Sequence, residues 1–351
     1  MFNPKYTITD RLLGNIKRIN NLVNELNNRR FPHVVLVELE KVARAVSTYA
    51  STSIEGNPLP LTEVKKILKS KPTHIRDSEK EILNYNRALQ ELNQKLVEGK
   101  VKVSLDLILR IQKQITEGLL PKFESGKLRE KPVVVNDPRT RKVIYLPPDA
   151  RDVRKLIEDL IEFVSNNRNE IDPLILAGIF HKQMVVIHPF MDGNGRATRL
   201  ATKVLLAEMG LNTFNLFSFE NYYNENVTKY FQTIGEFGNY YELVDKIDFT
   251  IWLEHFTEGI IDELLRVQKL LPEMGMGPGT QLKPCHLKIL GFIKDKGFIA
   301  DRDYTKLVDR AKATRALDFK KLMNLGLITR KGKGKATYYV FSSERERVIK
   351  G

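Results

Sequence analysis

The residues best able to do chemistry lie between 188 and 199, where the chain reads His-Pro-Phe-Met-Asp-Gly-Asn-Gly-Arg-Ala-Thr-Arg. An imidazole such as that of His188 can accept a proton near neutral pH. Asp192 offers a hard oxygen ligand, which suits a Mg²⁺ ion that bridges phosphates. Gly193 and Gly195 let the backbone approach a ligand, and their N–H groups lie where a helix is expected to begin, a position that favours an anion. The stretch therefore predicts a site for a phosphorylated ligand.

Two arginines complete this stretch. Arg196 and Arg199 are three residues apart, so on a helix they share a face and can clamp a polyphosphate from one side. Each feature alone has an ordinary explanation, since a single His-Pro usually ends a helix and a pair of arginines usually covers a solvated face. A base, a metal ligand, an anion cradle and two cations so close together instead indicate phosphoryl or nucleotidyl transfer.

Two helices are expected to hold this loop. The apolar run 174–187 is compatible with a helix that delivers the histidine, and Pro173 is a strong helix start. A second helical pattern runs from the arginines to about Met209, where Gly210 is a plausible cap. Hydrophobic periodicity predicts further helices near 12–26, 36–55, 78–98, 105–118 and 151–166.

The stretch 188–199 resembles the signature of Fic-domain proteins, His-x-Phe-x-(Asp/Glu)-Gly-Asn-Gly-Arg-x-x-Arg, and matches it at every specified position. The resemblance implies an enzyme that transfers AMP from ATP to a Ser, Thr or Tyr hydroxyl of a target protein in a Mg²⁺-dependent reaction. It implies that His188 deprotonates the hydroxyl and that Asp192 binds Mg²⁺ at the α- and β-phosphates. Phe190 is expected to be a buried anchor of the loop.

The resemblance assigns the remaining signature residues to the nucleotide. Asn194, with the N–H groups of Gly193 and Gly195, is expected to cradle the phosphates. Arg196 is expected to hold the β-phosphate region, and Arg199 to reach the γ-phosphate. Gly195 also bears on the group that is transferred, because relatives that phosphorylate their target typically carry a lysine at this position. Glycine here favours AMP transfer, although other relatives transfer other groups.

A second segment, 51–57, reads Ser-Thr-Ser-Ile-Glu-Gly-Asn and is similar to the family's inhibitory motif, (Ser/Thr)-x-x-x-Glu-(Gly/Asn), with Ser51 and Glu55 in register. In relatives with this arrangement the glutamate pairs with the second arginine of the signature, here Arg199. A carboxylate there removes the γ-phosphate clamp and misaligns ATP, and about 1 Å of misplacement can cost on the order of 10²-fold in rate. The alternative is a solvated carboxylate at a helix end.

Residues 132–148 carry the clearest strand signal before the C-terminal region, as two β-rich runs around an Asp-Pro turn. They resemble the family's flap, a hairpin that docks the target protein by strand pairing. A basic tip with Arg139, Arg141 and Lys142 favours an exposed position, whereas the alternative is a hairpin that only covers the core. The expected docking residues are Val133, Val134, Val135, Val143, Ile144 and Tyr145.

Aromatic residues cluster between 220 and 270, and most of them are expected to lie in the core. In the family, the Asn-x-x-Tyr-Tyr-like region after the signature contributes to the adenine pocket. Asn239, Tyr240 and Tyr241 are therefore candidates for binding the base. The alternative is packing, since aromatic stripes at helical spacing more often form core.

The composition is that of an ordinary globular protein, with 42% hydrophobic and 28% charged residues in a chain of 351. The single cysteine, Cys285, excludes an internal disulfide framework and is expected to be a packed helix residue rather than a nucleophile. No apolar run approaches the roughly 18 residues of a membrane span, and the N-terminus lacks a signal-peptide pattern. We therefore expect a soluble, cytoplasmic protein with no membrane partner.

The net charge of +14 is unevenly distributed, since residues 285–351 hold 17 Lys and Arg against 7 Asp and Glu. This region shows three short helical patterns and two strands around a Lys-Gly turn, which is typical of a winged helix. The predicted recognition helix, 312–325, carries Lys312, Thr314, Arg315 and Lys320. Duplex DNA is one candidate partner. Protein docking and dimerisation are the alternatives.

The expected fold is mainly α, with a Fic helical core, a small β-hairpin flap and a C-terminal winged-helix (α+β) domain. Four parts are predicted along the chain: an N-terminal helical region with the inhibitory motif, a Fic core with the flap and catalytic loop, a glycine-rich linker and the winged helix. Their boundaries are 1–110, 111–272, 273–284 and 285–351.

Three functions compete at this point. The leading hypothesis is an autoinhibited protein adenylyltransferase that uses ATP and Mg²⁺, modifies a hydroxyl of a target protein or of itself, and forms a homodimer. The second is a hydrolase in which Glu55 positions water to remove AMP from a modified protein. The third is a DNA-binding regulator that uses the Fic core as a sensor.

Overall fold

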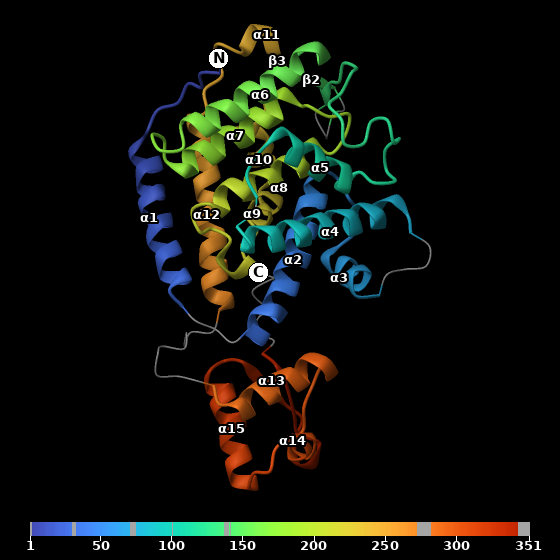
Figure 1. Ribbon diagram of the computed structural model, residues 1–351, viewed down its shortest axis with the longest axis vertical. Coiled ribbons are helices and arrows are strands. Elements are labelled where there is room, and N and C mark those ends of the chain that lie inside the picture. Colours follow the sequence, from blue (N-terminus) through green and yellow to red (C-terminus); the bar gives the residue numbers. More distant parts are fainter. Residues whose placement is uncertain are drawn as a thin grey trace. The chain divides into compact units, whose positions relative to one another are not determined.

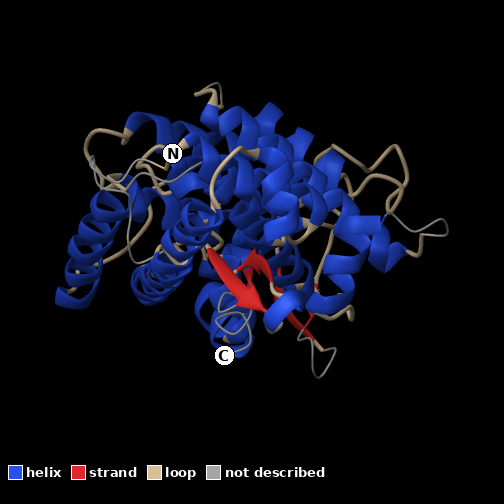
Figure 2. Ribbon diagram, turned by 90° about the horizontal axis from the view of Figure 1, so that it is seen from below, coloured by secondary structure: helices blue, strands red, loops and turns tan. Residues whose placement is uncertain are grey.

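The computed structural model describes residues 2–29, 33–70, 75–99, 101–136, 140, 142–271 and 282–342. These residues are mainly helical, with few and short strands (Figure 2). The chain divides into two compact units, one made of 1–21 and 43–263, the other of 22–42 and 264–351. No helix among the described residues is both long enough and apolar enough to cross a membrane. The four-part division expected from the sequence stays a prediction, and most of its linker lies outside the described residues.

Three helices contribute residues to both units: α1 (Asp10–Asn27), α2 (His33–Ile54) and α12 (Thr250–Leu270). The other helices of the first unit are α3 (Leu61–Ser70), α4 (Asp77–Val97), α5 (Leu105–Ile115), α6 (Ala150–Asn166), α7 (Pro173–Ile187), α8 (Asn194–Ala207), α9 (Glu220–Glu225), α10 (Val227–Ile234) and α11 (Tyr240–Leu243), with a short 3₁₀ turn, η1, at Thr213–Asn215. The periodicity predictions for α4 to α8 are confirmed, with helix ends shifted by at most three residues.

Helix α7 lies at the centre of the first unit because its sequence is apolar on every side. Asp172 caps it by accepting a hydrogen bond from Leu174 N at 2.8 Å, and Pro173 occupies the first turn. Nearly all of its side chains are buried, so it has no solvent-facing stripe. It packs against α6 and α8, and α8 also packs against α4 and α5 (Figure 1). The loop that joins α7 to α8 therefore begins and ends on helices that pack against α4, α5 and α6.

The predicted hairpin is present but shorter than expected. Strand β1 (Val135–Asn136) pairs antiparallel with β2 (Val143–Leu146), and β2 pairs parallel with β3 (Gly238–Asn239), in the order β1-β2-β3. Val133 and Val134 precede β1 and belong to no strand, which corrects the longer run expected from their β-branched side chains. Arg139 and Arg141 of the predicted tip lie outside the described residues. Within the described part of the chain, β1 lies at the edge of this sheet.

The second unit contains the helices and strands in the predicted order. Helices α13 (Pro284–Lys296), α14 (Asp301–Leu307) and α15 (Lys312–Asn324) precede β4 (Ile328–Lys331), a 3₁₀ turn η2 (Gly334–Ala336) and β5 (Tyr338–Phe341). Strands β4 and β5 are antiparallel, and an isolated bridge joins Ile299 to Tyr339. The assignment of this unit as a winged helix stays a prediction.

One residue of the predicted recognition helix is not available to a partner. Arg315 is buried, and its Nε and Nη2 donate to the two carboxylate oxygens of Asp301 at 2.8 Å each. Such a bidentate pair satisfies the guanidinium within the unit. Lys312 and Lys320 on the same helix are exposed. Contact with duplex DNA stays a prediction that rests on these lysines and on the basic turn.

Cys285 lies in a polar network of this unit. Its thiol accepts a hydrogen bond from Arg310 Nη1 at 2.7 Å, and the same guanidinium contacts both oxygens of Asp318. His286 Nδ1 accepts from the backbone N–H of Lys283, so its other nitrogen carries the proton toward Asp318. The cysteine is therefore a helix residue with a structural hydrogen bond, as the sequence predicts.

Candidate active site

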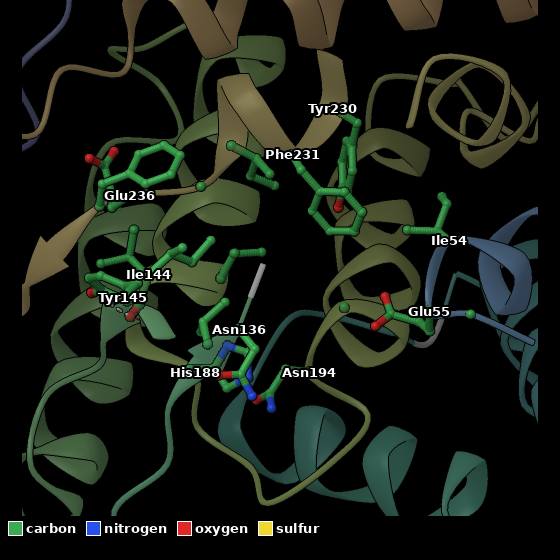
Figure 3. Close-up of a pocket in the computed structure, with 18 residues that line it drawn as sticks. Ile54, Glu55, Asn136, Ile144, Tyr145, His188, Asn194, Tyr230, Phe231 and Glu236 are labelled. Atoms are coloured by element: carbon green, nitrogen blue, oxygen red, sulfur yellow. Dashed lines mark hydrogen bonds between the residues drawn. The ribbon is translucent and has the colours of Figure 1, made fainter. Parts of the chain in front are cut away.

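A cavity of about 330 Å³ opens in the first unit, where four segments distant in sequence meet. Its wall comes from the turn after α2, from the flap, from the loop between α7 and α8, and from residues 230–237. Figure 3 shows Glu55 and His188 entering this cavity from different elements, with Asn194 beside the histidine. The structure thus brings the signature loop and the inhibitory motif to one place.

His188 ends α7 in a left-handed backbone conformation, with φ of 50° and ψ of 62°. Residues other than glycine seldom adopt this region, and such positions concentrate at functional sites. The turn directs the imidazole into the cavity, where its Nδ1 is buried without a hydrogen-bond partner among the described residues. Burial lowers the pKa of His188 to about 4, and the nearby Glu55 carboxylate opposes this shift. The ring is therefore neutral and able to accept a proton at physiological pH.

Arg129 holds the end of α7 and was not singled out by any sequence pattern. Its Nε donates to the carbonyl of His188 at 2.8 Å, and its Nη2 reaches the carbonyls of Ile187 and Pro148. Its backbone N–H donates to Pro189 O at 2.9 Å. The last carbonyls of a helix have no partner within the helix, so this buried guanidinium fixes the backbone that presents the histidine.

The signature loop is closed by its own asparagine. Asn194 Oδ1 accepts from Phe190 N at 2.8 Å, and Asn194 Nδ2 donates to Phe190 O at 2.9 Å. Phe190 is fully buried, which confirms its prediction as the anchor of the loop. Asn194 also lines the cavity, and its amide has a second N–H donor, so its predicted role in cradling phosphates stays a prediction.

The two glycines of the loop are required for different reasons. Gly193 caps α8 with φ of 82°, and a Cβ at this position would press against Thr116 and Ile115. Gly195 lies in the first turn of α8, and a Cβ there would collide with the carboxylate of Glu55. The Glu55 carboxylate therefore lies directly over the N-terminus of α8, where an anion would bind.

Arg199 is the best satisfied charge of the site. It is fully buried, and its Nη2 donates to Glu55 Oε1 at 2.7 Å and to the carbonyl of Ser51 at 2.9 Å. Its Nε donates to Ser51 Oγ at 2.8 Å, and its Nη1 lies 3.4 Å from Tyr230 Oη. Burial by itself would lower the pKa of this guanidinium, but the Glu55 carboxylate raises it above the ordinary value. The residues of the predicted inhibitory motif are thus in direct contact with the second signature arginine.

Arg196 is likewise held by carboxylates. Its Nη2 lies 2.8 Å from Asp192 Oδ2, and its Nη1 lies 2.6 Å from Glu81 Oε1. No sequence motif includes Glu81, which comes from α4. The Asp192 side chain is half exposed, so it is open to a metal ion that arrives with a nucleotide. One carboxylate together with substrate phosphates is a usual set of ligands for Mg²⁺.

The flap contributes the wall opposite Glu55. Val135, Ile144 and Tyr145 line the cavity, whereas Val134 and Val143 are exposed outside it. Tyr145 is buried and donates its hydroxyl to Val186 O at 2.9 Å. This tyrosine fastens the flap to α7, so its side chain is not presented to a partner.

The structure does not bring the predicted adenine-binding residues to the cavity. Asn239 caps α11 by accepting from Tyr241 N at 3.0 Å, and Tyr240 is buried beside it. Tyr241 donates its hydroxyl to Asp152 on α6. Tyr241 therefore points toward α6, and the role of these three residues in binding adenine stays a prediction. The aromatic residues that line the cavity are Tyr230, Phe231 and Phe237.

Residues 102–206 match the Fic/DOC family model. This range contains α5, the flap, α7 and the signature loop, and the last three of these contribute lining residues to the cavity. The chain carries a Fic domain. The helical fold with small β elements, expected from the resemblance, is confirmed.

Curated relatives of the Fic domain are named protein adenylyltransferase Fic. The chain is 30% identical to the one from Nematostella vectensis over 166 residues, covering 46% of this chain and 37% of the relative. It is 27% identical to the one from Drosophila grimshawi over 216 residues, covering 56% of this chain and 43% of the relative. The chain therefore spans about two fifths of the length of these relatives.

Solved structures share the fold. A Fic family protein from Desulfovibrio desulfuricans G20 matches with a TM-score of 0.65 at 21% identity, covering 97% of this chain and 98% of that one. A Fic domain containing signaling protein from Bacteroides thetaiotaomicron matches with a TM-score of 0.59 at 17% identity, covering 73% of this chain and 96% of that one. At these identities the likeness concerns the fold.

Proposed function

We propose that this chain is a protein adenylyltransferase that transfers AMP from ATP to a hydroxyl group of a protein, and that Glu55 holds it in an inhibited state. The names of the curated relatives support AMP transfer. The observation that carries the inhibited state is the contact of Glu55 with Arg199 directly over Gly195.

In the proposed reaction the target hydroxyl oxygen forms a bond to the α-phosphorus of ATP. The bond from this phosphorus to the bridging oxygen breaks, and pyrophosphate leaves. The hydroxyl proton passes to His188, whose neutral ring is the form present at physiological pH. Backbone N–H groups at the start of α8 and the two arginines bind the phosphates. A Mg²⁺ ion held by Asp192 would neutralise phosphate charge when bound.

The inhibition follows from competition for one guanidinium. A γ-phosphate that is to bind Arg199 must displace the Glu55 carboxylate, and until then two negative groups would share one buried site. Ser51 reinforces the pair, because its hydroxyl and carbonyl oxygens both accept from the same arginine. The inhibited state is therefore stabilised both by Ser51, in the last turn of α2, and by Glu55, directly after it.

The test is label transfer from α-labelled ATP with Mg²⁺. The Glu55→Gly variant should label either itself or an added protein extract, and chelation of Mg²⁺ should abolish the signal. The parent chain, which keeps Glu55, should incorporate little label. Equal labelling by a Glu55→Gly, His188→Ala double variant would contradict the proposed role of the histidine.

The reverse reaction is a second candidate, since Glu55 lines the same cavity as His188 and its side chain is 29% exposed. A carboxylate in that position can orient a water molecule toward an AMP-modified hydroxyl. Release of AMP from a modified protein by the parent chain, and its loss in Glu55→Gly, would favour hydrolysis. Label incorporation by Glu55→Gly without any such release favours transfer alone.

A further inference from the structure

Arg196 has a carboxylate partner that lies outside the signature. Glu81 on α4 places Oε1 2.6 Å from Arg196 Nη1, while Asp192 holds Nη2 at 2.8 Å. The side chains of Arg196 and Glu81 are only 5% and 15% exposed. A buried pair of this kind is screened little by solvent, so it competes strongly with any other anion for the same guanidinium.

Glu81 also touches the inhibitory segment. Its Oε2 accepts from Asn57 Nδ2 at 2.6 Å, and Asn57 lies two positions after Glu55. The same amide donates to Ser78 O at 2.9 Å, and Asn57 N donates to Thr52 O at 3.1 Å. One carboxylate therefore connects a phosphate-binding arginine on α8 with the turn that carries Glu55.

We propose that Glu81 is a second inhibitory carboxylate, which withholds Arg196 from the β-phosphate and, through Asn57, keeps the Glu55 turn in place. This inference rests on the proposed function, because it assumes that Arg196 binds a nucleotide phosphate. In the inhibited state both signature arginines are paired with glutamates from outside the signature, Glu81 on α4 and Glu55 just after α2. A nucleotide must displace both of them.

The electrostatic surroundings of Glu81 support this role. Burial raises the pKa of its carboxyl, Arg196 and Asn57 oppose the shift, and Glu55 and Asp192 add to it. Three carboxylates thus crowd around two arginines, and a further anion is disfavoured until one of them leaves. Arg196 Nε is buried without a hydrogen-bond partner among the described residues, so the bonding capacity of this guanidinium is not fully used in the paired state.

A different role would have the opposite effect. If Glu81 only orients Arg196 for the phosphate, its removal weakens nucleotide binding. If it is inhibitory, its removal strengthens binding. The affinity for ADP separates the two, because ADP carries the β-phosphate and cannot donate AMP with loss of pyrophosphate.

The experiment is calorimetric titration of the full chain with ADP in the presence of Mg²⁺. Glu81→Gln should bind ADP about 5–20-fold more tightly than the parent, which lies within the usual range of coupling between a ligand and a second interaction. The amide keeps the size of the side chain but loses the negative charge, and one of the two oxygens that now accept from Arg196 and Asn57 becomes a donor. Asp77→Asn is the matched control, since Asp77 is an exposed acid on the same helix whose one ion pair among the described residues is with Lys80. Its ADP affinity should equal that of the parent.

The link through Asn57 is tested with three variants: Glu81→Gln, Glu55→Gly and the double variant that combines these two changes. The ligand is α,β-methylene-ATP, which cannot release AMP. Because both carboxylates hold the same turn, the gain in the double variant should fall short of the product of the single gains. A gain equal to the product overturns the link. Thermal unfolding shows whether each variant is folded, and Glu81→Ala is the second variant if Glu81→Gln is not.

An unchanged or weaker ADP affinity in folded Glu81→Gln overturns the inference. Failure of the proposed function looks different, because it is seen as absence of AMP transfer by Glu55→Gly. Tighter ADP binding by Glu81→Gln without any AMP transfer would support the inference and contradict the proposed activity.

Discussion

Replacement of Glu55 by glycine should lower the stability of the protein and raise its affinity for ATP together. Arg199 is fully buried, and Glu55 is its only carboxylate partner among the described residues. Loss of one partner of a buried ion pair costs about 3–5 kcal/mol. Because the Glu55 side chain is 29% exposed, and because Ser51 and Tyr230 keep their contacts, we expect about 2 kcal/mol. In the first compact unit, residues 1–21 and 43–263, a loss of this size lowers Tm by about 4–8 °C.

The same free energy should reappear in nucleotide binding. In the parent chain the γ-phosphate must displace the carboxylate, whereas in Glu55→Gly it meets an unpaired guanidinium. A difference of about 2 kcal/mol corresponds to a roughly 30-fold gain in affinity. ADP lacks the γ-phosphate and should gain much less. The affinity is measured by calorimetry with α,β-methylene-ATP and ADP, and Tm by circular dichroism with and without ligand.

Two further variants make this test specific. Glu55→Ala separates the loss of the carboxylate from the backbone freedom of glycine, and it should behave like Glu55→Gly. Glu63→Gln removes only an exposed pair with Lys66 and should change neither Tm nor affinity. If Glu55→Gly melts with the parent and binds α,β-methylene-ATP no better, the pair with Arg199 does not compete with the nucleotide.

Three other outcomes follow from the site. Gly195→Ala should lower the free energy of unfolding by about 1–3 kcal/mol, because its Cβ meets the Glu55 carboxylate. Gly195→Ala should cost less unfolding free energy in the Glu55→Gly protein than in the parent. Thermal unfolding that gives the same loss in both proteins would contradict the collision. AMP transfer by Glu55→Gly should change little from about pH 8 to 5.5, since burial lowers the pKa of His188 to about 4 and its neutral form persists above that value. If the rate of label transfer instead fell by half near pH 6.5, the pKa of His188 would be that of an ordinary histidine. Arg129→Ala should destabilise the fold by about 2–4 kcal/mol, because it leaves the carbonyls of Pro148 and Ile187 unpaired, and it should reduce kcat more than it raises KM for ATP. An unchanged kcat in a folded Arg129→Ala protein would remove this arginine from the positioning of the histidine.

Local sequence patterns were sufficient for the helices that carry the site. The cap and proline at the start of α7, the apolar run after them and the glycines that follow depend on neighbours within a few positions. The same holds for Phe190 as a buried anchor. Strand length was predicted less well, because Val133 and Val134 have the side chains of a strand but find no partner to pair with.

The sequence says least about side chains whose role depends on where they point. Asn194 uses its amide to close the loop, and its expected role in binding phosphate stays a prediction. Tyr241, a candidate for the adenine pocket, donates its hydroxyl to Asp152 on α6. Arg315, a polar residue of the predicted recognition helix, is paired with Asp301. In each case the residue type suits two partners, and packing decides between them.

The sequence alone predicted the chemistry of the loop at 188–199. A base, an acid, glycines and arginines at fixed spacing have a local arrangement that depends little on the rest of the fold. Only the tertiary structure could show that Glu81 and Arg129 belong to the site, and that both arginines are paired with glutamates from distant parts of the chain. The reason is the range of the interactions. Backbone conformation is set by nearby residues, whereas an ion pair between α4 and α8, or a guanidinium on the end of α7, exists only after helices far apart in the chain have packed together.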